Sequence, residues 1–252
     1  MNLNKALTYM FEDKQWVNKV GIGALISLVP ILNFAWIGYS LEIMRRVMRG
    51  DPLPMPGWDE LGKKFMDGLM LFLAGLVYTL PVILLAGVPL AILIVPTILA
   101  GNDNTQGLAT ALFTAGGLVS MGLICVFFLY GLALSIVYPA IYIEYARKGT
   151  FASCFNFKDI FAQIKKNVGA FFTAWGVYLG ISIGASMASG IIGTPLGWIP
   201  CLGQLVVVAV ILAAALYTQL VYAHLFGQYG AMDGIVTPPI VTPPAATPPT
   251  VA

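Results

Sequence analysis

Few side chains in this sequence have the chemistry of a catalytic or cofactor site. The single histidine, His224, lies near the end of a long apolar segment. It could serve as an axial ligand to haem or to chlorophyll-type magnesium, or it could carry a proton. The alternative is a structural histidine that is hydrogen-bonded to a neighbouring carbonyl. We favour the structural role because the sequence has no second histidine to complete a site.

Other residue types that build catalytic or metal sites are sparse or badly spaced. The three cysteines, Cys125, Cys154 and Cys201, form no C-x-x-C pair and have no metal-ligand spacing. No Walker or His-Glu-x-x-His pattern occurs. We therefore expect a protein that is not an enzyme and that has no metal site and no cofactor.

The composition indicates an all-α integral membrane protein. The chain is 59% apolar and 10% charged, whereas soluble globular domains are roughly 45–50% apolar and 25% charged. With 13 basic and 11 acidic residues, much of its surface must face lipid. The net charge of +2 provides no basic field for nucleic acid, which we exclude as a partner.

Apolar stretches long enough to cross a bilayer lie between three charged segments, 1–19, 42–67 and 144–166. We predict four to five transmembrane helices, with kinks or a break where prolines interrupt the second stretch. The segments 68–100, 108–143 and 168–227 contain no Asp, Glu, Lys or Arg. Ion-coupled transporters normally have such residues in their spans, so this absence argues against that class. The stretches are 20–41, 68–100 (with Pro81, Pro89 and Pro96), 108–143, 168–191 and 203–227.

Lysine and arginine residues set the predicted topology. Segments 42–67 and 144–166 hold five each, whereas the polar turns 101–107 and 192–202 hold none. The positive-inside rule places the two charged segments in the cytoplasm and the two turns outside.

Segment 20–41 admits two interpretations. It could cross the membrane once, or it could enter and return at residues 30–33, which brings all thirteen basic residues to one side. We favour the re-entrant form because Pro30, Asn33 and the nearby glycines are typical of a broken segment. Segment 1–19 agrees as an amphipathic helix, with one apolar face formed by Leu3, Leu7, Met10 and Phe11.

Two further segments, 57–69 and 155–168, are patterned as amphipathic helices. The apolar faces are Trp58, Leu61, Phe65 and Leu69 in the first, and Phe157, Ile160, Phe161, Ile164 and Val168 in the second. We interpret both as helices in the membrane interface, the alternative being solvated loops packed on the spans. The basic residues expected to contact anionic lipid headgroups are Arg45, Arg46, Lys63, Lys64, Arg147, Lys148, Lys158, Lys165 and Lys166.

Small residues recur every four positions in the stretch 168–191, at Gly176, Gly180, Gly184 and Ala188. This spacing lets helix backbones approach closely in lipid. We expect Gly180 to touch another helix of the same chain, with dimerisation as the alternative.

The chain divides into an N-terminal helix (1–19), a membrane domain (20–227) and a proline-rich tail (228–252). The tail repeats Thr-Pro-Pro at 237, 242 and 247. This composition favours an extended polyproline II conformation that could lie along a partner.

Scattered motifs resemble the prokaryotic membrane proteins grouped as domain of unknown function 4013, over about residues 10–230. The resemblance implies a multi-pass protein of a prokaryotic cytoplasmic membrane and carries over no activity or catalytic residue. Pro56-Gly57 departs from the family, which tends to have an acidic residue there. The motifs are Gly21-x-Gly23, Leu28-x-Pro30-x-x-Asn33, Gly38-Tyr39, Arg45-Arg46, Gly50, Leu53-Pro54, Trp58-Asp59, Gly62, Asp67-Gly68, Phe155-x-Phe157, Ile160, Asn167 and His224-Leu225-x-Gly227.

Two functions fit these features. The first is a scaffolding subunit that assembles with other membrane proteins, for which the small-residue face, the uncharged spans and the tail argue. The second is a transporter or channel-like protein for a neutral or lipid-like solute, favoured by the proline-interrupted stretch and the re-entrant segment. A cavity lined by Asn33, Gln219 and hydroxyl groups would favour transport.

Overall fold

The computed structural model describes residues 1–100 and 105–232, and within them it confirms an all-α fold. The proline-rich repeat at 237–249 lies outside the described residues. The helices are α1 (Leu3–Glu12), α2 (Trp16–Ser27), α3 (Asn33–Arg49), α4 (Leu61–Leu99), α5 (Gln106–Lys148), the 3-10 helix η2 (Phe151–Phe155), α6 (Phe157–Lys166), α7 (Val168–Leu196) and α8 (Leu202–Ala231).

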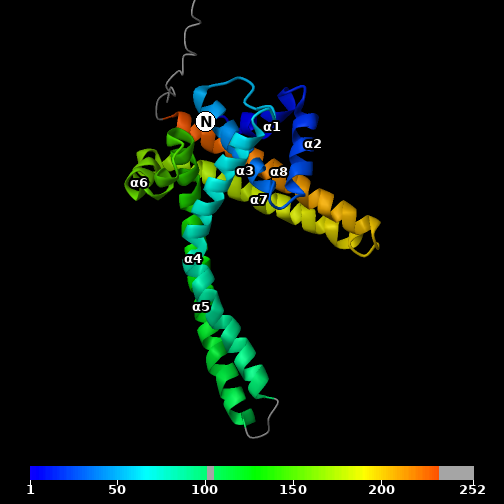
Figure 1. Cartoon of the computed structure of the whole chain (residues 1–252), viewed down its shortest axis with the longest axis vertical. Coiled ribbons are helices and arrows are strands. Elements are labelled where there is room, and N and C mark those ends of the chain that lie inside the picture. The colour runs from blue at the N-terminus through cyan, green and yellow to red at the C-terminus, as the bar shows by residue number, and fades with distance from the viewer. Residues whose placement is uncertain (101–104, 233–252) are drawn as a thin grey trace, which may run out of the picture.

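Two long helical hairpins extend in different directions from a shared base (Figure 1). One hairpin is α4 and α5, and the other is α7 and α8. The base consists of α1, α2, α3, η2 and α6 together with the adjoining ends of the hairpins. In the described part of the chain, four helices are long and apolar enough to cross a membrane, namely Leu61–Gly87 of α4, α5, α7 and α8. The chain is therefore a multi-pass membrane protein.

Helix α3 forms the centre of the base. Ten of its 17 residues are buried, and it packs against α4 on one side and α8 on another. Tyr39, Leu41 and Ile43 are fully enclosed. Because α3 contacts both hairpins, it fixes where the two pairs of spans diverge.

The N-terminal apolar segment is broken, as the sequence predicts. Helix α2 ends at Ser27 and α3 begins at Asn33, with Pro30 in the turn between them. The side chains of Leu28 and Ile31 in this turn are 56% and 66% exposed. A single straight span over 20–41 is thus excluded. Insertion of the apolar turn into lipid stays a prediction, which this exposure supports.

A break in α4 and a separate interfacial helix over 57–69 are both wrong, whereas kinks at the prolines stay a prediction. The helix runs from Leu61 to Leu99 without a break, although it includes three prolines. No separate interfacial helix occupies 57–69, because α4 begins at Leu61 and continues into the span. Gly68 of α4 lies in close contact with α3, where an added Cβ would overlap the Phe34 carbonyl. Trp58 precedes α4 and stacks on Tyr39 with ring centroids 4.6 Å apart.

The second predicted amphipathic helix, over 155–168, is confirmed in its central ten residues, which form α6. The Asn156 side chain caps it by accepting a hydrogen bond from the Asp159 backbone N–H. Ile160 and Ile164 are buried, whereas Phe157 and Phe161 are 53% and 47% exposed. Exposed aromatic rings beside exposed lysines fit a helix at the membrane surface, which remains a prediction.

The topology can be tested with the natural Cys201, which is exposed in the turn between α7 and α8. In a variant with Cys125→Ser and Cys154→Ser, we expect a membrane-impermeant maleimide to label Cys201 on intact cells. In a second variant with all three cysteines replaced and Lys158→Cys in α6, labelling should require lysis, since basic loops stay in the cytoplasm. Labelling of both positions from one side would contradict the predicted topology.

Candidate functional site

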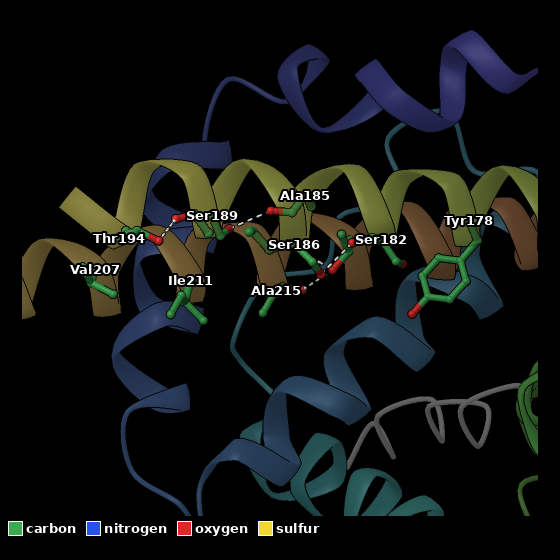
Figure 2. Close-up of a pocket in the computed structure, with 13 residues that line it drawn as sticks. Tyr178, Ser182, Ala185, Ser186, Ser189, Thr194, Val207, Ile211 and Ala215 are labelled. Atoms are coloured by element: carbon green, nitrogen blue, oxygen red, sulfur yellow. Dashed lines mark hydrogen bonds between the residues drawn. The ribbon is translucent and has the colours of Figure 1, made fainter. Parts of the chain in front are cut away.

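A hydroxyl-lined cavity of 670 Å³ lies along the α7–α8 hairpin (Figure 2). In Figure 2 the side chains of Tyr178, Ser182 and Ile211 point to the same side of the hairpin. The cavity is lined by Tyr178, Ser182, Ala185, Ser186, Ser189, Gly190, Gly193 and Thr194 from α7, and by Val207, Ile211, Ala214, Ala215 and Thr218 from α8.

Most hydroxyl groups in this cavity donate their proton to their own helix. Ser186 donates to the carbonyl of Ser182 at 2.8 Å, and Thr194 donates to that of Gly190 at 2.7 Å. This back-bonding leaves the oxygen lone pairs able to accept a hydrogen bond from a ligand. Ser182 differs, because its Oγ is buried and has no hydrogen-bond partner among the described residues. Its hydroxyl can therefore donate to a ligand as well as accept.

A second cavity, of 260 Å³, adjoins the first at Ala215 and lies between α2, α3 and α8. The Oγ of Ser27 is also buried without a hydrogen-bond partner in the described chain. The amide of Gln219 donates to the Ser40 hydroxyl at 3.0 Å, which holds it across the α3–α8 interface. The lining residues are Ser27, Asn33, Trp36, Ile37, Leu212, Ala215, Leu216 and Gln219.

A third cavity, also of 260 Å³, shares Gln219 with the second and Tyr178 with the first. It lies between α5, α7 and α8 and is lined by Ser135, Tyr138, Pro139, Tyr142, Trp175, Tyr178, Leu179, Gln219 and Tyr222. Each pair of these three cavities shares one lining residue, and we refer to the three together as the α8 cleft. None of the residues that line it is Asp, Glu, Lys, Arg or His.

His224 is placed as a structural residue. It is 3% exposed, and its ring stacks on Tyr9 with centroids 4.3 Å apart. Its Nδ1 lies 2.9 Å from the Gln228 amide, a partner that replaces the backbone carbonyl expected from the sequence. One face and the Nδ1 of the imidazole are thus engaged by protein groups, and a role as an axial ligand through Nε2 stays untested.

The small-residue face of α7 does not pack on another helix of this chain. Gly176, Gly180 and Gly184 are exposed, and a Cβ added at each would meet no atom within 4 Å. Ala188 is exposed as well. The predicted intramolecular contact of Gly180 is therefore wrong. The helices meet instead through large rings such as Phe171 and Phe226, 5.9 Å apart, which do not require glycine.

The predicted lipid-contacting cations separate into two groups. Arg45, Lys63, Arg147 and Lys148 line one cavity in the base, where Arg147 also donates to the Gly230 carbonyl. The others lie outside it, and Lys64 is only 6% exposed. Its assignment as a lipid contact is wrong, because Lys64 lies at the close crossing of α3 and α4, where a Cβ at Gly38 would overlap its backbone carbonyl. Those outside the cavity are Arg46 on α3, Lys64 on α4, and Lys158, Lys165 and Lys166 on α6.

Ser182 and Cys154 lie in settings that differ from those of activated nucleophiles. Residues 180–184, Gly-Ile-Ser-Ile-Gly, spell the Gly-x-Ser-x-Gly pattern of serine hydrolases, an exception to the absence of catalytic motifs expected above. That pattern acts at a sharp strand-to-helix turn, whereas Ser182 lies inside α7. Burial raises the pKa of the Cys154 thiol to about 11, which keeps it protonated at neutral pH. No cluster of three potential metal ligands occurs in the described residues.

The unpartnered hydroxyls of Ser27 and Ser182 are the site features that sequence reasoning missed. The sequence signal for Ser182 is weak, since serine recurs at 182, 186 and 189 on one side of a predicted span. Spacing of three and four residues places these serines on one face of a helix. Ser27 has no comparable signal, because only the return of α3 brings it toward Gln219.

Comparisons with known proteins place the chain in a family. A family model described as protein of unknown function (DUF4013) matches residues 22–194, which is more than half of the chain. The match is shorter than the resemblance predicted from motifs, and it leaves out the motif that begins at His224. Neither the curated proteins nor the solved structures gave a match. The four membrane-spanning helices and the family match together identify the chain as a multi-pass membrane protein that belongs to the DUF4013 family of unknown function.

Proposed function

We propose that this protein binds and moves a neutral, amphipathic solute through the α8 cleft, as a transporter or channel-like protein. The observation that carries the proposal is the pair of buried hydroxyls, Ser27 and Ser182, which have no hydrogen-bond partner in the described chain and lie at an uncharged cleft. A buried polar group without a partner costs free energy unless a ligand or water satisfies it.

The lining of the cleft supports this class of solute. Apolar side chains such as Val207 and Ile211 accept hydrocarbon, and the hydroxyls and the Gln219 amide accept or donate hydrogen bonds. A charged ligand would lose its hydration without gaining an opposite charge in return. A neutral headgroup with hydroxyl groups, attached to an acyl chain, fits both parts of the lining.

Binding can be followed through the two tryptophans of the cleft, Trp36 and Trp175. In the purified protein in nanodiscs, we expect a monoacylglycerol with a brominated acyl chain to quench saturably the part of the tryptophan fluorescence that comes from these two of the five tryptophans. Replacing Ser27 and Ser182 together by valine should weaken this binding about thirtyfold, since each of the two hydrogen bonds to the ligand contributes about 1 kcal/mol.

The matched control is Ser120→Val in α5, whose side chain lines none of the three cavities. It should bind the monoacylglycerol as the unmodified chain does. Equal affinity of the Ser27/Ser182 variant and the control would contradict a solute site in the α8 cleft. Transport itself is then measured as release of the same monoacylglycerol from loaded proteoliposomes.

The second candidate function is a scaffolding subunit of a larger membrane complex in the prokaryotic cytoplasmic membrane. The exposed face of Gly176, Gly180 and Gly184 favours it, because an open glycine face lets a helix of another chain approach closely. Purification from the native membrane in mild detergent should then yield stoichiometric partners. The substitution Gly180→Ile should release these partner proteins, whereas the α8 cleft should still bind its solute.

A further inference from the structure

Gln219 of α8 lies between the two smaller cavities of the α8 cleft. It lines both of them, the one between α2, α3 and α8 and the one between α5, α7 and α8. Among the described residues that line these two cavities, Gln219 alone belongs to both. A ligand that occupies either cavity therefore meets the Gln219 amide.

The orientation of this amide follows from the hydrogen bonds of Ser40. The Ser40 hydroxyl, on the buried side of α3, donates its single proton to the Ile37 carbonyl at 2.7 Å. It can therefore only accept from Gln219, which lies 3.0 Å away. Since only the Nε2 of an amide has protons to donate, Nε2 must face Ser40, and Oε1 faces away from it.

The Oε1 of Gln219 is an acceptor without a donor. Within residues 1–100 and 105–232, no group donates a hydrogen bond to this oxygen atom. The cavities that it adjoins contain no charged side chain among their lining residues. An acceptor in such a place favours a ligand that brings a hydroxyl or an N–H group.

Several hydroxyls of the α8 cleft have the same requirement as Oε1. Thr218 and Ser189 in the 670 Å³ cavity, and Ser135 in the cavity between α5, α7 and α8, each donate to a carbonyl of their own helix. Figure 2 marks this bond for Ser189. A hydroxyl whose proton is used in this way can only accept from a ligand, so these groups also need a ligand that donates.

We infer that Gln219 selects solutes whose headgroup donates a hydrogen bond, and that Ser40 is the positioning residue that keeps Oε1 available. The inference rests on the proposed binding of a neutral solute in the α8 cleft and narrows the class of that solute. A lipid-like alcohol, such as a monoacylglycerol with two free hydroxyls, meets the requirement. An analogue with methylated hydroxyls has only acceptors, and a site built to accept a hydrogen bond rejects such an analogue.

The test compares a monoacylglycerol that has a brominated acyl chain with its dimethyl ether, by quenching of tryptophan fluorescence in nanodiscs that contain the full chain. We expect the unmodified chain to bind the monoacylglycerol at least about fivefold more tightly than the ether, because the ether cannot donate to Oε1. The readout is the ratio of the two affinities. A general disturbance of the fold would weaken both probes alike and leave this ratio unchanged.

Gln219→Met keeps the length of the side chain and removes the amide oxygen. It should weaken binding of the monoacylglycerol about fivefold and change binding of the ether little, so that the ratio falls. Ser40→Ala leaves the amide free to turn either way and should also lower the ratio, which provides a second variant if Gln219→Met is unstable. The matched control is Gln204→Met on the same helix, since Gln204 lines none of the three cavities. It should keep the ratio of the unmodified chain.

The failure of this inference differs from the failure of the proposed function. Equal affinities of the two probes for the unmodified chain, or an unchanged ratio in Gln219→Met, would overturn the selection by Gln219 and leave the solute site intact. An unchanged ratio in Ser40→Ala would overturn the positioning role of Ser40. If neither probe binds saturably, the solute site itself is refuted, and the role of Gln219 with it.

Discussion

We expect Gly38→Ala to destabilise the base more than any of the other substitutions proposed for this protein. Gly38 lies on α3 where it crosses α4, and a Cβ there would overlap the backbone carbonyl of Lys64. On the other side of the same crossing, a Cβ at Gly68 would overlap the carbonyl of Phe34. The two glycines thus let the helix backbones touch, which is the role of small residues in helix crossings within membranes.

The overlap at Gly38 involves backbone atoms, so a change of side-chain rotamer cannot relieve it. Separating α3 from α4 would also disturb α8, because α3 packs on both. We expect Gly38→Ala to cost about 3 kcal/mol or more, at the upper end of overpacking substitutions. For a chain of this size that corresponds to a fall of about 10 °C in the melting temperature.

The measurement is the thermal unfolding of the purified protein in detergent, followed by its tryptophan fluorescence, to which the buried Trp36 contributes. Gly180→Ala is the control, since a Cβ there meets no atom of the chain within 4 Å. It should melt within about 2 °C of the unmodified protein, as surface substitutions do. Equal melting temperatures for the two variants would show that the α3–α4 crossing is not close-packed.

Replacing Arg45 by glutamine should give the second-largest loss. Arg45 joins three helices of the base, because its guanidinium pairs with Asp67 of α4 and its Nε donates to the Ala146 carbonyl of α5 at 3.2 Å. The side chains of Arg45 and Asp67 are only 15% and 17% exposed. Removing the arginine leaves the Asp67 carboxylate poorly hydrated and beside Glu42, without its closest counter-charge.

We expect Arg45→Gln to lower the free energy of unfolding by about 2 kcal/mol, less than for a fully buried pair because water still reaches both groups. Adding Asp67→Asn should recover about half of this loss by removing the uncompensated charge. Arg49→Gln is the control, since its pairs are 3.5 Å long and more exposed. Denaturant unfolding of the four proteins measures these differences in the free energy of unfolding. A loss no larger in Arg45→Gln than in Arg49→Gln would refute the structural role of the pair.

Local composition was sufficient to predict the helical spans and the break near Pro30. An apolar run of about 20 residues has few stable forms in lipid other than a helix, because every backbone N–H and C=O needs a partner. Pro30 and Asn33 lie close together in such a run and favour a break there, whereas the separate prolines of α4 do not break their helix. The helix α6 was predicted for the same reason, since its apolar period is read along one short segment.

Pairwise contacts between helices could not be predicted in this way. The spacing of Gly176, Gly180 and Gly184 indicates a face that another helix can approach, but it does not indicate which helix does so. Gly38 and Gly68 show no such repeat, yet they form the backbone contact between α3 and α4. Lys64 belongs to a basic run that is typical of a surface, but the crossing beside it leaves it buried.

The sequence by itself determined that this is an all-α membrane protein with a broken N-terminal segment, and its motifs indicated the family. These properties depend on residues that are close together along the chain, and so they can be predicted from the local sequence. Only the tertiary structure decided that Ser27, Asn33 and Gln219 line one cleft, and that Arg45, Lys63 and Arg147 surround one cavity. Both sites join helices that are far apart in sequence, and the packing angles of those helices depend on side chains from every element of the base at once.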